Sequence, residues 1–162
     1  MGAFSLIEVL IATILVGLSI AALLAANGSF SMANVAGADL STAEFLTEQI
    51  RELTTMLSAA DPDGTTWTTL GPESGETLAT YDDVDDFNAF DSATLGAPIS
   101  AKSEPLTALA AFRQQNTVQK VDPSNFDQTR PDNDPSNFIR VTVTILQNGR
   151  PINSASWIRA RY

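Results

Sequence analysis

The chain has 162 residues and a net charge of −10, and it contains neither cysteine nor histidine. Its length allows one soluble domain and an additional helix but not two full domains. Its acidity argues against nucleic acid and anionic lipid as partners, since both bind basic surfaces. Without cysteine or histidine there is no disulfide, no thiolate metal site and no Ser-His or Cys-His nucleophile pair, so we expect that the protein is not an enzyme.

The N-terminal segment is an apolar run with one carboxylate near its start. Residues Val9 to Ala26 carry no charge. At 1.5 Å per residue they would form a helix of roughly 27 Å, close to the thickness of the hydrocarbon core of a bilayer. The pattern therefore predicts a membrane-spanning segment. Glu8 is the exception, because an ionised carboxylate there costs about 2.5–3.5 kcal/mol unless it lies at the interface or has a partner. We infer that Glu8 has a function.

The segment from Gly2 to Leu10 closely resembles the processing and N-methylation site of type IV pilins and of the pseudopilins of type II secretion. The resemblance implies that a prepilin peptidase cuts between Ala3 and Phe4 and that Phe4 is then N-methylated. It also implies that Glu8 meets the amino terminus of a neighbouring subunit when the helices bundle into a filament. A cation beside Glu8 at low dielectric would offset the desolvation cost of both charges.

Two features depart from the pattern of that family. The family usually has Gly before the cut, so either Ala3 replaces it or the cut follows Gly2. Family leaders normally carry Lys or Arg, whereas no basic residue precedes Arg51 here. We therefore expect either that the protein begins upstream of Met1 or that its leader is unusually short. A secretory signal peptide or a plain signal anchor is the alternative interpretation of the apolar run.

The helical pattern continues beyond the apolar run. Residues 1–3 are then a leader remnant, residues 4–28 form the membrane or filament-core half of one long helix, and residues 29–59 form an amphipathic half that packs on a globular head, residues 60–162. Apolar residues at intervals of three and four define the packing face of this second half: Ala43, Leu46, Ile50, Leu53 and Leu57.

The predicted helix runs from about Phe4 to about Ala59, and Pro62 and Gly64 are expected to end it. Glycine costs about 1 kcal/mol relative to alanine inside a helix. Gly17, Gly28 and Gly37 each carry this cost, so the sequence predicts bending or local melting between residues 27 and 37.

Residues 61–100 are rich in Asp, Gly, Ser, Thr and Pro, and they are predicted to form loops. Four carboxylates lie close together in this segment: Asp82, Asp83, Asp85 and Asp86. Such a run repels itself unless it is solvated, hydrogen-bonded or bound to a cation. Two interpretations stay open, a solvated acidic face and a calcium site made of these four residues. No other cofactor is expected.

The C-terminal third of the chain predicts antiparallel strands. Residues 112–121 are expected to form a strand and residues 123–137 an irregular surface loop. Residues 138–147 alternate between apolar and polar side chains, and Asn148-Gly149 favours a type I′ turn, so residues 138–162 predict a β-hairpin. A regular register places Ile145, Val143 and Ile139 opposite Ile152, Ser154 and Ile158, and Arg140 opposite Trp157 as a cation–π pair.

Together these patterns predict an α+β, pilin-like fold in which one long N-terminal helix packs on a small antiparallel sheet. By resemblance, the protein is a minor pilin or pseudopilin of a type IV pilus or type II secretion filament. Its expected partners are other pilin or pseudopilin subunits, the prepilin peptidase, an inner-membrane assembly platform and the membrane itself. We expect a single-pass inner-membrane protein with a periplasmic head. The alternative is a non-polymerising, membrane-anchored binding protein whose acidic head holds a cation or a basic partner.

Overall fold

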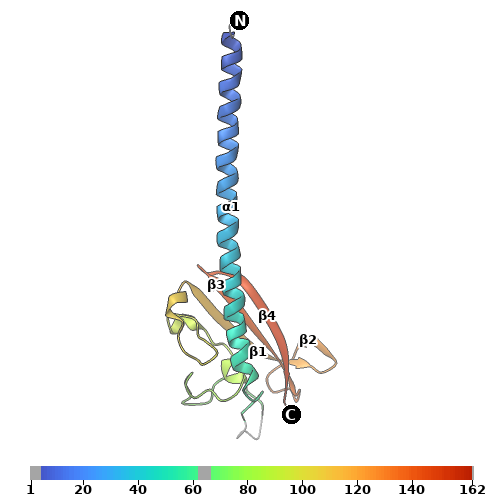
Figure 1. The fold of residues 1–162 in the computed structure, drawn as a ribbon. Coiled ribbons are helices and arrows are strands. Elements are labelled where there is room, and N and C mark those ends of the chain that lie inside the picture. Colours follow the sequence, from blue (N-terminus) through green and yellow to red (C-terminus); the bar gives the residue numbers. More distant parts are fainter. Residues whose placement is uncertain (1–4, 62–66, 162) are drawn as a thin grey trace. The chain divides into compact units, whose positions relative to one another are not determined.

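The computed structural model describes residues 5–61 and 67–161, which form an α+β arrangement (Figure 1). The chain divides into two compact units, Met1–Asp39 and Leu40–Tyr162, so the two parts of the long helix are described separately. The helix is α1 (Leu6–Thr55), and three short 3-10 turns follow it: η1 (Asp85–Phe87), η2 (Ser92–Thr94) and η3 (Thr107–Leu109). The strands are β1 (Phe112–Asp122), β2 (Asn125–Thr129), β3 (Phe138–Gln147) and β4 (Arg150–Ala160).

The first turn of α1 is closed by a capping box. Ser5 Oγ accepts a hydrogen bond from the Glu8 N–H at 3.3 Å, and Glu8 Oε2 accepts one from the Ser5 N–H at 3.2 Å. The local melting predicted between residues 27 and 37 is wrong, because this segment is helical throughout. Helix propagation is cooperative, so the hydrogen-bonded turns on both sides outweigh the cost of the isolated glycines.

The helix ends at Thr55, before the predicted end near Ala59. The predicted stop at residues 62–64 lies outside the described residues. The helix stops early because the head engages the backbone that follows it. The N–H of Val84 donates a hydrogen bond of 2.9 Å to the carbonyl oxygen of Ser58, and Ser58 forms an isolated parallel bridge with the neighbouring residue of the acidic run. This contact requires extended rather than helical backbone at Ser58.

The four strands form one antiparallel sheet in the order β2-β1-β3-β4. The strands predicted at residues 112–121 and 138–147 are confirmed as β1 and β3. The loop predicted at residues 123–137 is only partly correct, since β2 pairs with the end of β1 there. Every side chain of β2 is exposed, so this edge strand has no alternating hydrophobic pattern that a sequence could reveal.

The hairpin between β3 and β4 forms at Asn148-Gly149 as predicted, with φ values of 52° and 76° that suit a type I′ turn. The predicted register beyond the turn is wrong, because Ile152 is an extra residue on β4 and creates a β-bulge. Pro151 lies next to this bulge on an edge strand, where proline is tolerated. The observed partners of Ile145, Val143 and Ile139 are Asn153, Ala155 and Arg159.

The shifted register also changes the environment of Trp157. A shift of one residue moves a side chain to the opposite face of the sheet. Arg140 therefore lies opposite Ile158, and the predicted pair of Arg140 with Trp157 is wrong. Trp157, rather than Ile158, packs against the core, and the guanidinium group of Arg51 lies over its ring at 5.4 Å. Trp157 thus joins β4 to the last turns of α1.

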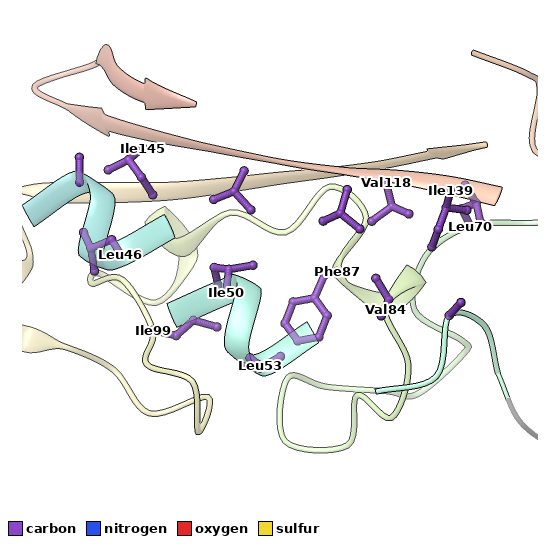
Figure 2. Packing of buried hydrophobic residues seen from close by; sticks show 14 of the residues in the cluster. Leu46, Ile50, Leu53, Leu70, Val84, Phe87, Ile99, Val118, Ile139 and Ile145 are labelled. Carbon is purple, nitrogen blue, oxygen red and sulfur yellow. The ribbon is translucent and has the colours of Figure 1, made fainter. Parts of the chain in front are cut away.

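The core of the unit Leu40–Tyr162 forms between α1 and one face of the sheet. The predicted helical stripe and the apolar face of β3 are buried as expected, except for Leu57, which lies beyond the helix end and is only partly buried. The segment predicted as loop also contributes to the core. Figure 2 shows the labelled core side chains, which are Leu46, Ile50 and Leu53 from α1, Val118, Ile139 and Ile145 from the sheet, and Leu70, Val84, Phe87 and Ile99 from residues 61–100.

Candidate functional sites

The part of α1 in the unit Met1–Asp39 carries a continuous apolar surface. All described residues up to residue 38 are exposed, and the large apolar side chains among them include Leu6, Ile11, Leu15, Ile20, Leu24 and Phe30. An 18-residue window of this helix has a mean hydropathy of 2.7, and none of it is buried. By length and composition, α1 can cross a membrane. The same surface can also pack against other apolar helices.

Glu8 lies at the start of this surface. Ala3 and Phe4, the residues implied in processing, lie outside the described residues. Glu8 is exposed, and within residues 5–61 and 67–161 it forms no ion pair. Its carboxylate accepts from the Ser5 N–H in the capping box described above. The sequence analysis missed this local role, although a Ser followed three residues later by a Glu is a known helix-start signal.

The acidic run has a different environment from a solvated face. Asp82 is exposed, but Asp83, Asp85 and Asp86 are 0%, 2% and 1% exposed. The interpretation of the run as a solvated surface is therefore wrong for three of its four carboxylates. The cause is the two apolar residues beside these aspartates, because Val84 and Phe87 enter the core and hold the neighbouring aspartates below the surface.

One oxygen of each buried carboxylate accepts hydrogen bonds from backbone N–H groups. Asp83 Oδ1 accepts from the N–H groups of Asp85 (2.8 Å) and Asp86 (3.1 Å). Asp86 Oδ2 accepts from Asp82 (3.0 Å) and Asp83 (3.4 Å), and Asp85 Oδ2 accepts from Gly71 (3.3 Å). The other oxygens, Asp83 Oδ2, Asp85 Oδ1 and Asp86 Oδ1, are buried, and in the described part of the chain no group donates a hydrogen bond to them. Each such oxygen carries a desolvation cost that a proton or a cation would relieve.

Burial and mutual repulsion make these carboxyl groups hard to ionise. Burial, with repulsion from Asp85, raises the pKa of Asp83 to about 7. Burial is also the main reason that the pKa of Asp85 rises to about 6 and that of Asp86 to about 7, where the charge of Asp83 adds to the effect. Near neutral pH these three carboxyl groups can therefore take up and release protons.

Lys120 is buried in the same unit, but its ammonium group has other partners. Lys120 Nζ donates hydrogen bonds to the carbonyl oxygens of Trp67 and Asp134, the latter at 2.8 Å. It also lies over the Trp67 ring, 4.8 Å from the ring centroid. In the described part of the chain, Lys120 forms no ion pair with the acidic run.

The structure groups the carboxylates differently from the sequence. Oxygens of Asp82, Asp83 and Asp86 lie within 4.8 Å of one another, and so do oxygens of Glu73, Glu76 and Asp86. Asp85 belongs to neither group, since it turns toward Gly71 and a cavity of about 40 Å³ that Trp67 and Arg161 also line. The sequence analysis did not select Glu73 or Glu76. Their spacing of three residues, with Gly75 between them, is the only local signal for them.

Two features of this geometry have chemical consequences. One is an apolar helix surface with a carboxylate near its start, and the other is a buried cluster of acidic side chains. In the comparisons, no model of a protein family, no curated protein and no solved structure matches the chain. Function is therefore inferred from the residues themselves.

Proposed function

We propose that the protein is a minor pilin or pseudopilin, a subunit of a type IV pilus or type II secretion filament that assembles through the N-terminal part of α1. The observation that carries this proposal is the exposed apolar surface that begins at Glu8, directly after residues that resemble a prepilin processing site. The α+β head, with the last turns of α1 packed on an antiparallel sheet, supports the same function.

The energetics of the helix surface favour an assembled subunit. Apolar surface exposed to water costs about 25 cal/mol per Å². Removal of the exposed Leu, Ile and Val side chains from water is therefore favourable. Lipid covers them while the subunit is in the membrane, and neighbouring α1 helices cover them in a filament. Glu8 would then pair with the amino terminus of the next subunit, where each charge offsets the desolvation of the other. In this proposal the membrane is the inner membrane, the head is periplasmic, and the partners are the prepilin peptidase, an assembly platform and other subunits.

Mass spectrometry of the mature N-terminus tests the processing step. We expect a chain that begins with methylated Phe4 when the prepilin peptidase is present, and an uncut chain when the peptidase gene is deleted. An uncut chain in both strains, or a cut by ordinary signal peptidase near Ala25, would overturn the proposal.

The role of Glu8 in assembly can be separated from its role in the capping box. Glu8→Gln removes the charge but keeps an oxygen that accepts from the Ser5 N–H, whereas Ser5→Ala removes the Oγ cap and keeps the charge. If the charge serves assembly, Glu8→Gln remains in the membrane but is lost from filaments, and Ser5→Ala assembles. The reverse result would assign Glu8 to helix capping alone.

The rival function is a membrane-anchored binding protein that does not polymerise. The buried acidic cluster is the observation that favours it, because such a cluster suits a bound cation. The same variants separate the two functions. If both variants and the unaltered chain stay in the membrane and none enters sheared filaments, the anchored binding protein is the correct interpretation.

A further inference from the structure

We propose that the head binds one Ca²⁺ ion through the carboxylates of Glu73, Glu76 and Asp86, a set that differs from the aspartate run suggested by the sequence. This inference does not rest on the filament function. Asp86 is the centre of the acidic cluster, since it belongs to both carboxylate groups. The proposed site joins the turn at residues 73–76 to the 3-10 turn η1.

The separation of the oxygens fits a single calcium ion. Calcium binds oxygen at about 2.3–2.6 Å, so two ligands on opposite sides of the ion are about 4.6–5.2 Å apart. The ligand oxygens of Glu73, Glu76 and Asp86 all lie within 4.8 Å of one another. Three oxygens at such separations can therefore share one ion at about the calcium–oxygen distance.

A buried oxygen without a partner points to a missing ligand. Asp86 is 1% exposed, its Oδ2 is held by two backbone N–H groups, and within residues 5–61 and 67–161 no N–H group donates to its Oδ1. Asp83, which belongs to the same cluster, also has a buried oxygen, Oδ2, that accepts no hydrogen bond from the described residues. Two carboxylates elsewhere in the head differ, because Asp91 pairs with Arg113 and Asp122 pairs with Arg130. Across residues 5–61 and 67–161, no such ion pair involves Asp83 or Asp86.

The kind of ligand follows from the donor atoms. Carboxylate oxygens on a flexible loop suit Ca²⁺, whereas Mg²⁺ demands a near-ideal octahedron and Zn²⁺ prefers nitrogen and sulfur ligands. Glu73 is exposed and Glu76 is half-buried, so an ion can enter from solvent and reach the buried Asp86. Because Phe87 is in the core beside Asp86, a bound ion would fasten the loop to the core and stabilise the folded head.

Thermal unfolding of the full chain in detergent micelles tests the proposal. Ca²⁺ is compared with chelator at matched ionic strength, and Trp67 and Trp157 report the head by fluorescence. At a hundredfold excess over Kd, we expect Ca²⁺ to raise the melting temperature by about 10 °C. Mg²⁺ at the same concentration should have a much smaller effect. Identical melting curves with Ca²⁺ and chelator, or equal effects of the two ions, would overturn the proposal.

Variants test which carboxylates bind the ion. Glu73→Gln with Glu76→Gln should weaken calcium binding at least about tenfold in calorimetry, since two of three ligand charges are lost. Glu44→Gln with Glu104→Gln is the matched control, because it changes the same charge at exposed sites outside the cluster. This control should bind calcium with the same affinity as the unaltered chain.

One further variant separates the two carboxylate groups. Asp82→Asn should leave the affinity within about twofold, because Asp82 is not a ligand in the proposed set. Full calcium binding in the double Gln variant, with loss of binding in Asp82→Asn, would place the ion at the other group and overturn the assignment. Both variants change exposed or half-buried side chains, so the melting curve in chelator shows directly whether the head still folds.

Discussion

The part of α1 between Leu6 and Asp39 exposes its apolar side chains, whereas the part between Leu40 and Thr55 buries a stripe of them. Both parts contain Leu, Ile and Ala, so composition does not separate them. The pattern does, because residues 9–26 of the first part are uncharged and carry apolar side chains all round the helix, whereas the second part buries apolar side chains on one side only. A helix with one apolar face finds its partner in the same domain. A helix that is apolar all round needs lipid or other chains as its partner.

The largest difference between the two parts should appear when equivalent isoleucines are truncated. Ile50 is 0% exposed and Ile20 is 54% exposed. We expect Ile50→Ala to lower the free energy of unfolding of the head by about 3 kcal/mol, because it leaves a cavity between α1 and the sheet. Ile20→Ala should leave this value unchanged. Denaturant titration of the full chain in micelles, followed by tryptophan fluorescence, measures both, and equal effects would contradict the comparison.

A smaller effect is expected from Gln114, a buried amide that ties the second part of α1 to the head. Gln114 Nε2 donates to the carbonyl oxygens of Leu46 (3.0 Å) and Ile99 (3.1 Å), and its Oε1 accepts from the Ile99 N–H at 2.6 Å. Gln114→Ala leaves these buried groups unsatisfied, so we expect a loss of about 2 kcal/mol in the same titration. Gln119→Ala is the control on the same strand, where the side chain is exposed. If Gln114→Ala loses no more unfolding free energy than Gln119→Ala, water satisfies the groups that the Gln114 amide had bound.

Replacement of Arg159 on β4 should destabilise the C-terminal end of α1. Arg159 donates hydrogen bonds to the carbonyl oxygens of Thr55 (3.3 Å) and Leu57 (2.7 Å), and its charge lies at the negative end of the helix dipole. We expect Arg159→Ala to cost about 1 kcal/mol of head stability. Arg150→Ala, at the exposed start of the same strand, is the control and should cost nothing measurable. If both cost the same, net charge and not capping explains the loss.

The smallest effect should come from the start of α1. Ser5→Ala removes the Oγ acceptor of the capping box, so we expect about 0.5 kcal/mol of local helix stability to be lost. Hydrogen exchange of the first-turn amides in micelles should speed up by about twofold. Head unfolding should not change, since the head lies in the other compact unit. A lower unfolding midpoint of the head would show that the two parts of α1 are energetically coupled.

Local patterns determined much of this protein. The alternation of β3 and the Asn148-Gly149 turn fixed two strands and their connection, because side chains two residues apart share a face and a type I′ turn needs positive φ at both positions. The stripe containing Leu46 and Ile50 correctly identified the buried face of α1, and the unbroken apolar run near Glu8 identified the surface that stays exposed.

Tertiary contacts decided what the local patterns left open. The helix ends at Thr55 because the head engages the backbone beyond it, and the bulge at Ile152 shifts the register of β4. The burial of Asp86 depends on Phe87, which enters a core built from distant segments, and the approach of Glu73 depends on the path of the loop. Neighbours in sequence fix periodicity and turns, but a carboxylate is buried only when residues far along the chain close over it.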